Sequence, residues 1–328
     1  MNKALISFLK ILRKLYFKIT NKQKSLPICI KDEDNASTLI YEKLISNEPL
    51  MIARFGSTEL INITNYISIK NPKYHNPLMF VKGETPPWWW QENVMLQLQN
   101  WSGFFPPTKE KISIFCEMMI EDSKQVDILG SWIEDEKFMN EYMNDTKIHL
   151  RFLEPFWSEN PWSKALKGKK ILVVHPFKNT IKRQYEKRDL LFKNKDLLPE
   201  FKSLDIIRAV QSLGGQSNQF KNWFDALEYM KLEIDKIDYD ICLIGAGAYG
   251  FPLAAHVKRQ GKQSIHMGGA LQLLFGIKGK RWEDPYYGVQ QWGIEKNFYI
   301  NLMNEHWVRA DETETPKTAN NVEGGCYW

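Results

Sequence analysis

The stretch CLIGAGAYGFPLAAHVKRQGKQSIHMGG, residues 242–269, decides the fold class. Its apolar start predicts a buried strand, and the G-x-G-x-x-G spacing that follows predicts a tight turn into a helix. The three glycines of this turn are Gly245, Gly247 and Gly250. A second strand, KQSIH, comes next and is followed directly by Gly268 and Gly269. A strand, a glycine turn, a helix and a second strand are typical of a parallel sheet.

Three interpretations of the glycine turn are open. Glycines let the backbone approach a ligand closely, and the N-terminus of the following helix attracts a phosphate. A nicotinamide dinucleotide site also needs an acidic residue about 20 positions further on, yet no Asp or Glu lies between Phe251 and Leu274. The sequence therefore favours another phosphorylated ligand over NAD(P). Tight packing of the helix on the strands is the third interpretation.

Strands and helices alternate along most of the remaining chain. Further strands are expected within residues 49–56, 125–132, 147–152, 169–177 and 204–210. Helices are expected at residues 35–45, 57–69, 108–123, 134–143, 179–188 and 222–237. Residues 70–107, which contain many prolines and three adjacent tryptophans, are expected to form a loop. This order predicts an α/β, Rossmann-like fold with a mostly parallel sheet flanked by helices.

The turns after the expected strands locate the site. Ligands of such sheets bind beyond the carboxyl ends of the strands. Glycine, small or polar residues follow the strands at residues 54–59, 130–132, 175–180, 245–250 and 268–269. We therefore expect a binding site at this edge of the sheet.

Composition excludes several classes of protein. With 43% hydrophobic and 25% charged residues, the 328-residue chain is neither disordered nor composed like a membrane-spanning protein. A formal net charge of only +5 argues against nucleic acid as a partner. The 4 cysteines are far apart, as expected of reduced thiols in a cytoplasmic protein. The 12 tryptophans suit a protein that handles sugars or touches a membrane edge.

Residues 1–25 differ from the rest of the chain. They contain seven lysines or arginines and no acidic residue, and their apolar side chains recur at helical spacing. This pattern predicts a basic amphipathic helix, in which Lys10 and Arg13 interrupt any membrane-spanning run. Such a helix can lie on an anionic membrane surface, here the inner face of the plasma membrane. Packing on the body of the protein, with the basic side in solvent, is the alternative.

The decapeptide MIARFGSTEL, residues 51–60, resembles the R-F-G-[DS]-x-E turn of the GT-D-fold glycosyltransferases, bacterial enzymes of polysaccharide and glycan assembly. The matching residues are Arg54, Phe55, Gly56 and Glu59. Residues 243–282 and 314–328 are similar to related proteins of polysaccharide gene clusters, so the resemblance covers most of residues 45–328. It implies a GT-D-like domain at residues 26–328 behind the helix at residues 1–25.

The resemblance implies transfer of a sugar from a nucleoside diphosphate sugar to a glycan or lipid-linked acceptor. We expect Arg54 to bind a donor phosphate or to pair with Glu59, and Tyr249 to stack on a base or sugar. The residues expected to bind the donor are Arg54, Gly56, Ser57, His175, Gly245, Gly247, Tyr249, Gly250, Gly268 and Gly269.

Glu59 is the expected catalytic or metal-binding residue. The family's first turn carries an aspartate-x-glutamate pair that helps to hold a divalent cation, whereas Ser57 stands at the aspartate position here. A serine hydroxyl is a weaker ligand for Mn²⁺ or Mg²⁺ than a carboxylate. Glu59 could bind such a metal with the donor phosphates, act as the base, or serve only as a partner of the helix dipole.

The main hypothesis is therefore a glycosyltransferase of bacterial surface polysaccharide synthesis. The serine substitution keeps a second hypothesis open, a non-catalytic nucleotide-sugar binding protein of the same fold. An NAD(P)-dependent oxidoreductase is the third hypothesis, which the missing acidic residue disfavours.

Overall fold

The computed structural model describes residues 2–22, 25, 27–212, 219–319 and 324–328. Within them, seven strands form one parallel sheet in the order β3-β2-β1-β7-β6-β4-β5. The strands are β1 (Leu50–Ala53), β2 (Ile128–Ser131), β3 (Thr146–His149), β4 (Lys170–His175), β5 (Ser203–Arg208), β6 (Ile241–Ile244) and β7 (Gln263–His266). The predicted α/β, Rossmann-like fold is confirmed.

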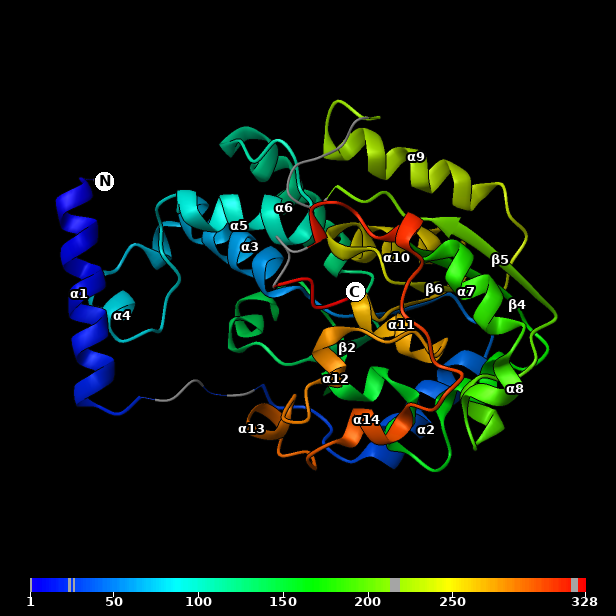
Figure 1. Ribbon diagram of the computed structural model, residues 1–328. Coiled ribbons are helices and arrows are strands. Elements are labelled where there is room, and N and C mark those ends of the chain that lie inside the picture. Colours follow the sequence, from blue (N-terminus) through cyan, green and yellow to red (C-terminus); the bar gives the residue numbers. More distant parts are fainter. Residues whose placement is uncertain (1, 23–24, 26, 213–218, 320–323) are drawn as a thin grey trace.

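Helices cover both faces of the sheet (Figure 1). One face carries α3 (Ser57–Lys70), α5 (Glu92–Ser102), α6 (Lys109–Ser123), α9 (Trp223–Asp235) and α10 (Gly250–Arg259). The other carries α2 (Glu33–Ile45), α7 (Lys178–Tyr185), α8 (Arg188–Leu191), α11 (Leu271–Leu274), α12 (Lys280–Glu283) and α14 (Phe298–Leu302), and α13 (Val289–Trp292) lies near them. Because both faces are covered, β1, β6 and β7 are buried along their whole length, which explains the continuous apolar runs of β1 and β6.

The opening stretch forms the predicted unit. β6 leads through a three-ten turn (Gly247–Tyr249) into α10, and the chain returns as β7, which pairs in parallel with β6. The chain leaves β1 and β6 toward the helices of one face, whereas it leaves β7 and β4 toward α11 and α7 on the other. Neighbouring strand ends thus diverge, which opens crevices at the carboxyl edge of the sheet.

The prediction that residues 70–107 form a loop is wrong, because this segment contains α4 (Pro77–Val81) and α5. The Asn76 side chain caps α4, Pro77 occupies its first turn, and α5 ends at the left-handed Gly103. The short helix expected at residues 134–143 is a three-ten helix that spans Glu134–Met139. The prolines and tryptophans of this region concealed ordinary helix signals.

The predicted amphipathic helix is α1 (Lys3–Ile19), which stands at one end of the molecule beside α4 (Figure 1). Leu9 is buried against Phe80 and Trp89, and Trp88 packs on the same cluster. The adjacent tryptophans therefore form a hydrophobic plug that attaches α1 to the body. No helix in the described ranges is both long and apolar enough to cross a bilayer.

Candidate active site

A cleft of about 590 Å³ lies at the carboxyl ends of β1, β2, β3 and β7, and we call it the main cleft. It brings together predicted site residues that are up to 215 positions apart in the sequence, namely Arg54, Gly56, Ser57, Glu59, Gly247, Gly268 and Gly269. The expectation that the turns after several strands converge is met at this edge of the sheet.

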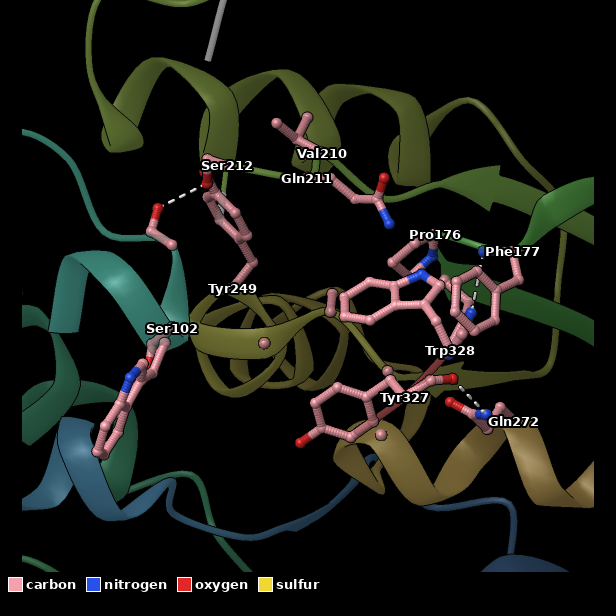
Figure 2. Close-up of a pocket in the computed structure, with 17 residues that line it drawn as sticks. Ser102, Pro176, Phe177, Val210, Gln211, Ser212, Tyr249, Gln272, Tyr327 and Trp328 are labelled. Atoms are coloured by element: carbon pink, nitrogen blue, oxygen red, sulfur yellow. Dashed lines mark hydrogen bonds between the residues drawn. The ribbon is translucent and has the colours of Figure 1, made fainter. Parts of the chain in front are cut away.

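A second hollow, which we call the small cavity, has a volume of about 100 Å³ and lies between the ends of β4 and β6 (Figure 2). It holds other predicted residues, namely His175, Gly245 and Tyr249. The main cleft and the small cavity share Trp101, Ser102, Gly247, Gly269 and Tyr327, so they adjoin.

Arg54 carries the charge at the centre of the main cleft. Its guanidinium lies 5.3 Å from the ring centroid of Trp132, whose indole N–H donates to the Phe55 carbonyl at 3.1 Å. In the described part of the chain, no carboxylate pairs with Arg54 and no acceptor binds its guanidinium, so the expected pair with Glu59 does not form. A half-buried arginine that stacks on an indole but has no described carboxylate or hydrogen-bond acceptor is available to an anionic ligand.

The Glu59 carboxylate folds back over the start of α3. Thr58 Oγ1 donates to Glu59 Oε2 at 2.9 Å and also contacts the Ser102 hydroxyl. A Cβ atom on Gly56 would lie 1.9 Å from Glu59 Oε2, so a side chain at this position would displace the Glu59 carboxylate from the place it occupies. The carboxylate thus sits in the first turn of α3, where the helix dipole stabilises negative charge.

Metal binding at this turn stays a prediction. Among the residues that the structure describes, no three His, Cys, Asp or Glu side chains gather as a metal site. Glu59 offers one carboxylate beside the Ser57 hydroxyl, which falls short of the oxygen set that Mn²⁺ or Mg²⁺ requires. A cation here would need ligand phosphates and water for most of its coordination.

The glycines of the opening stretch have different roles. Gly247 and Gly268 have φ angles of 54° and 64° and line the main cleft. A Cβ on Gly245 would lie 2.7 Å from the Gly268 carbonyl oxygen, so Gly245 allows these two turns to touch. Gly250 lines neither hollow and instead packs on the His266 ring, 2.1 Å from where its Cβ would be. For Gly250, the packing interpretation replaces the expected donor contact.

We predict that Gly250→Ala destabilises the protein by about 3 kcal/mol, since the new methyl group would displace the buried His266 ring. Denaturant unfolding measures this change in the free energy of unfolding. Gly168→Ala is the control for an added Cβ that meets nothing: no atom lies within 4 Å of it, and the only cost comes from the φ of 70°, whereas Gly250 has a helical φ of −61°. We expect the control to cost about 1 kcal/mol. Equal losses at the two sites would contradict the proposed packing of Gly250 on His266.

Both buried histidines of the site are neutral at pH 7. Burial lowers the pKa of His175 to about 3, and burial together with nearby Arg54 lowers the pKa of His266 to about 3. The Phe177 backbone N–H donates to His175 Nδ1 at 3.1 Å. The proton of neutral His175 is therefore on Nε2, which is left as a donor on the small cavity.

Tyr249 is held by the protein rather than presented to a ligand. Its ring is buried and stacks on Trp223 with a centroid separation of 4.8 Å and an interplanar angle of 7°. Its hydroxyl lies 2.8 Å from Ser212 Oγ, and Figure 2 shows the two side chains next to each other. These contacts leave little of the ring for the expected stacking on a base or sugar.

Glu154 is a site residue that the sequence analysis missed. It follows the three-ten helix Leu150–Leu153, is buried, and lines the main cleft. Tyr299 Oη and Trp157 Nε1 donate to its Oε2 at 2.8 and 3.3 Å. Burial raises the pKa of Glu154 to about 7 despite these two donors. No described residue binds Oε1, so this oxygen is free to exchange a proton with a ligand.

Aromatic side chains form the walls of the main cleft. They are Trp101, Trp132, Trp282, Tyr287, Trp292 and Tyr327. Two further arginines, Arg151 and Arg281, line the same space. Arg151 donates to the Trp292 carbonyl at 3.2 Å and Arg281 to the Tyr327 hydroxyl at 3.3 Å. Flat apolar walls with polar groups between them suit the alternating C–H and O–H surfaces of a sugar.

Compared with models of protein families, with curated proteins and with solved structures, the chain matches none. The likeness of residues 51–60 to the GT-D turn therefore stays a prediction from those residues alone. The case for a function rests on the geometry of the main cleft.

Proposed function

We propose that the protein is a glycosyltransferase that uses a nucleoside diphosphate sugar. One observation carries the proposal, the convergence of phosphate-binding and proton-transfer groups in a single aromatic-walled cleft. Arg54 and the turns at Gly247 and Gly268 supply positive charge and close backbone approach. Glu154 supplies a carboxyl group whose pKa lies near the working pH.

In the proposed transfer, each of these groups has one step. The donor diphosphate would lie against Arg54 and the glycine turns, with its sugar between the tryptophan walls. The acceptor hydroxyl oxygen would form a bond to the anomeric carbon as the bond from that carbon to the phosphate oxygen breaks. The nucleoside diphosphate leaves with the bonding electrons, and Arg54 stabilises its added charge. The acceptor proton moves to Glu154 Oε1.

Glu59 has a supporting part in this proposal. Its carboxylate is bound by Thr58 at the start of α3, on the side of the main cleft that holds Arg54. We propose that it orients the donor, together with Mn²⁺ or Mg²⁺ if a cation enters with the diphosphate. Such a cation would neutralise charge on the leaving diphosphate.

The two alternative functions raised by the sequence, an oxidoreductase and a non-catalytic binding protein, make different predictions for the same ligands. A nicotinamide site needs an acidic residue after β7, but β7 ends at His266 and continues as Met267, Gly268 and Gly269. A non-catalytic binding protein would take the sugar nucleotide and release no nucleotide from it. The free Oε1 of Glu154 in the main cleft favours the enzyme.

The test is a turnover assay with sugar nucleotides of each common base, each with and without Mn²⁺, in which released nucleoside diphosphate is measured. We expect slow release to water and faster release with a glycan or lipid-linked acceptor. Binding without release, with every donor and acceptor class, would support the non-catalytic alternative. A nicotinamide absorbance change would support the oxidoreductase.

We also propose that α1 holds the enzyme on an anionic membrane surface, on the cytoplasmic side, where a lipid-linked acceptor would meet the cleft. α1 packs on the body through Leu9, yet a second apolar stripe stays exposed, formed by Leu5, Phe8, Ile11, Leu15 and Ile19. At 100° per residue, these side chains share one side of the helix. Exposed lysines at positions 3, 10, 14 and 18 flank the stripe. The stripe and the lysines complement lipid chains and anionic headgroups respectively.

Replacing Phe8 and Leu15 together by glutamine should weaken binding to vesicles that contain anionic lipid at least about tenfold. Vesicle co-sedimentation at low and high salt measures the effect, and high salt should weaken wild-type binding as well. Leu190→Gln with Leu232→Gln is the matched control, because both leucines are exposed elsewhere on the molecule. Equal binding by all three proteins would contradict the membrane role of α1.

A further inference from the structure

We propose that the small cavity is the subsite for a pyrimidine base, so that the donor is a pyrimidine nucleoside diphosphate sugar. This inference rests on the proposed function, because it states which nucleotide that site accepts. The small cavity lies where the chain leaves β4 and β6 toward opposite faces, and it meets the main cleft at Gly247 and Gly269. A diphosphate at these glycines would direct its sugar into the main cleft and its nucleoside into the small cavity.

Gln272 supplies a hydrogen-bond acceptor to the small cavity. Its amide nitrogen donates to the backbone carbonyls of Ile277, Lys278 and Tyr327 at 3.3, 3.0 and 3.0 Å. These bonds fix which end of the amide is nitrogen, and Figure 2 shows the one to Tyr327. No described residue donates to Oε1, although the side chain is only 1% exposed. A buried acceptor on the cavity wall calls for an N–H group from a ligand.

His175 supplies the complementary donor. The Phe177 N–H occupies its Nδ1, so Nε2 carries the hydrogen, and no described residue accepts from Nε2. The ring is buried and lines the small cavity together with Gln272. One donor and one acceptor on the same small hollow match a base that presents an N–H group beside a carbonyl or ring nitrogen.

The aromatic walls and the volume of the small cavity favour a base with one ring, a pyrimidine, over a purine with two fused rings. Figure 2 shows the Trp328 indole beside Pro176 and Phe177, and its ring centroid is 6.2 Å from that of Phe177. Bases stack readily on such side chains. The small cavity has a volume of about 100 Å³ against about 590 Å³ for the main cleft, which suits a pyrimidine rather than a fused purine.

The experiment compares the affinities of UDP, CDP, ADP, GDP and inorganic pyrophosphate by calorimetry. Wild type should bind UDP or CDP at least about tenfold more tightly than ADP, GDP or pyrophosphate, because only the pyrimidine gains stacking and base hydrogen bonds. Trp328→Leu should weaken the binding of UDP and CDP about tenfold and leave the affinity for pyrophosphate unchanged. Trp328 is the last residue, and its substitution leaves the Gln272 bonds to the backbone in place.

Tyr229→Leu is the control, since this exposed aromatic residue lies on α9 and lines neither the main cleft nor the small cavity. It should leave the affinity for UDP and CDP unchanged. The base subsite would be overturned if purine nucleotides bound as tightly as pyrimidine nucleotides, or if the Trp328→Leu variant kept full affinity for UDP and CDP. In either case, binding of pyrophosphate would still support the proposed function. Failure of wild type to bind pyrophosphate and every nucleotide would instead contradict the proposed function itself.

Discussion

Glu154→Gln should lower kcat for sugar transfer by about 100-fold to 1,000-fold and leave the affinity for the donor unchanged. Glutamine keeps an oxygen that can accept the hydrogen bonds from Tyr299 and Trp157, so these two buried donors stay paired. What it lacks is a group that can take the proton of the acceptor hydroxyl. Steady-state transfer kinetics and donor titration measure the two quantities separately.

The pH profile distinguishes this role from a structural one. A base acts only when ionised, so wild-type kcat should rise with pH and level off above about 7, the pKa to which burial raises Glu154. The Glu154→Gln variant should show no rise in that range. Glu159→Gln is a suitable control, because this exposed glutamate lies close in sequence but not in the cleft lining. A fully active Glu154→Gln variant would contradict the assignment of the base.

Stability should change with pH in the opposite direction. The pKa of Glu154 is raised from 4.5 to about 7 in the folded protein, so the folded state binds more protons than the unfolded state between these values. The free energy of unfolding therefore falls as pH rises through this window, by a contribution on the order of 3 kcal/mol. Denaturant unfolding of Glu154→Gln should lack this contribution. An unchanged pH dependence in the variant would show that the carboxyl group is not the source.

Arg54→Gln should weaken the binding of nucleoside diphosphates by about 30-fold to 150-fold, the effect of losing charged hydrogen bonds worth about 2–3 kcal/mol. The reason is that Arg54 has no described carboxylate or hydrogen-bond acceptor and lies beside the glycine turns. Because an unpaired charge is removed, the melting temperature should not fall. A lower melting temperature with unchanged affinity would show that Arg54 stabilises the fold and does not bind the ligand.

The same substitution at an exposed arginine provides the control. Arg183 pairs with Asp311 outside both hollows, so Arg183→Gln should leave nucleotide affinity unchanged. If both variants lost affinity equally, the effect would come from net charge rather than from a contact in the cleft.

Much of the fold and part of the site were predictable because their signals are local. An apolar run, a glycine turn and a helix in residues 241–259 already define β6 and α10. In a parallel sheet the carboxyl ends of all strands lie at one edge, so the sequence alone predicts that Arg54, Gly247 and Gly268 lie close together. The same local signal does not separate these glycines from Gly250, which lies one turn further on and lines neither hollow.

The rest depends on contacts between distant segments. The pKa of Glu154 is raised because the surrounding aromatic groups bury it, among them Tyr299, which lies 145 positions later. The local sequence LEPFW carries no catalytic motif that would have drawn attention to it. The stacking of Tyr249 on Trp223, 26 positions earlier, likewise has no signal in the local sequence. The insertion of β7 between β1 and β6 has no local signal either, yet it brings the Arg54 turn and the glycine turns into one cleft.

The most direct measurement is a calorimetric titration of the wild-type protein with nucleoside diphosphate sugars, repeated with Arg54→Gln and Arg183→Gln. We predict saturable binding of at least one such donor at one site per chain, lost or strongly weakened in Arg54→Gln and kept in Arg183→Gln. If no nucleoside diphosphate sugar binds, or if Arg54→Gln binds it as tightly as wild type, the main cleft is not the donor site.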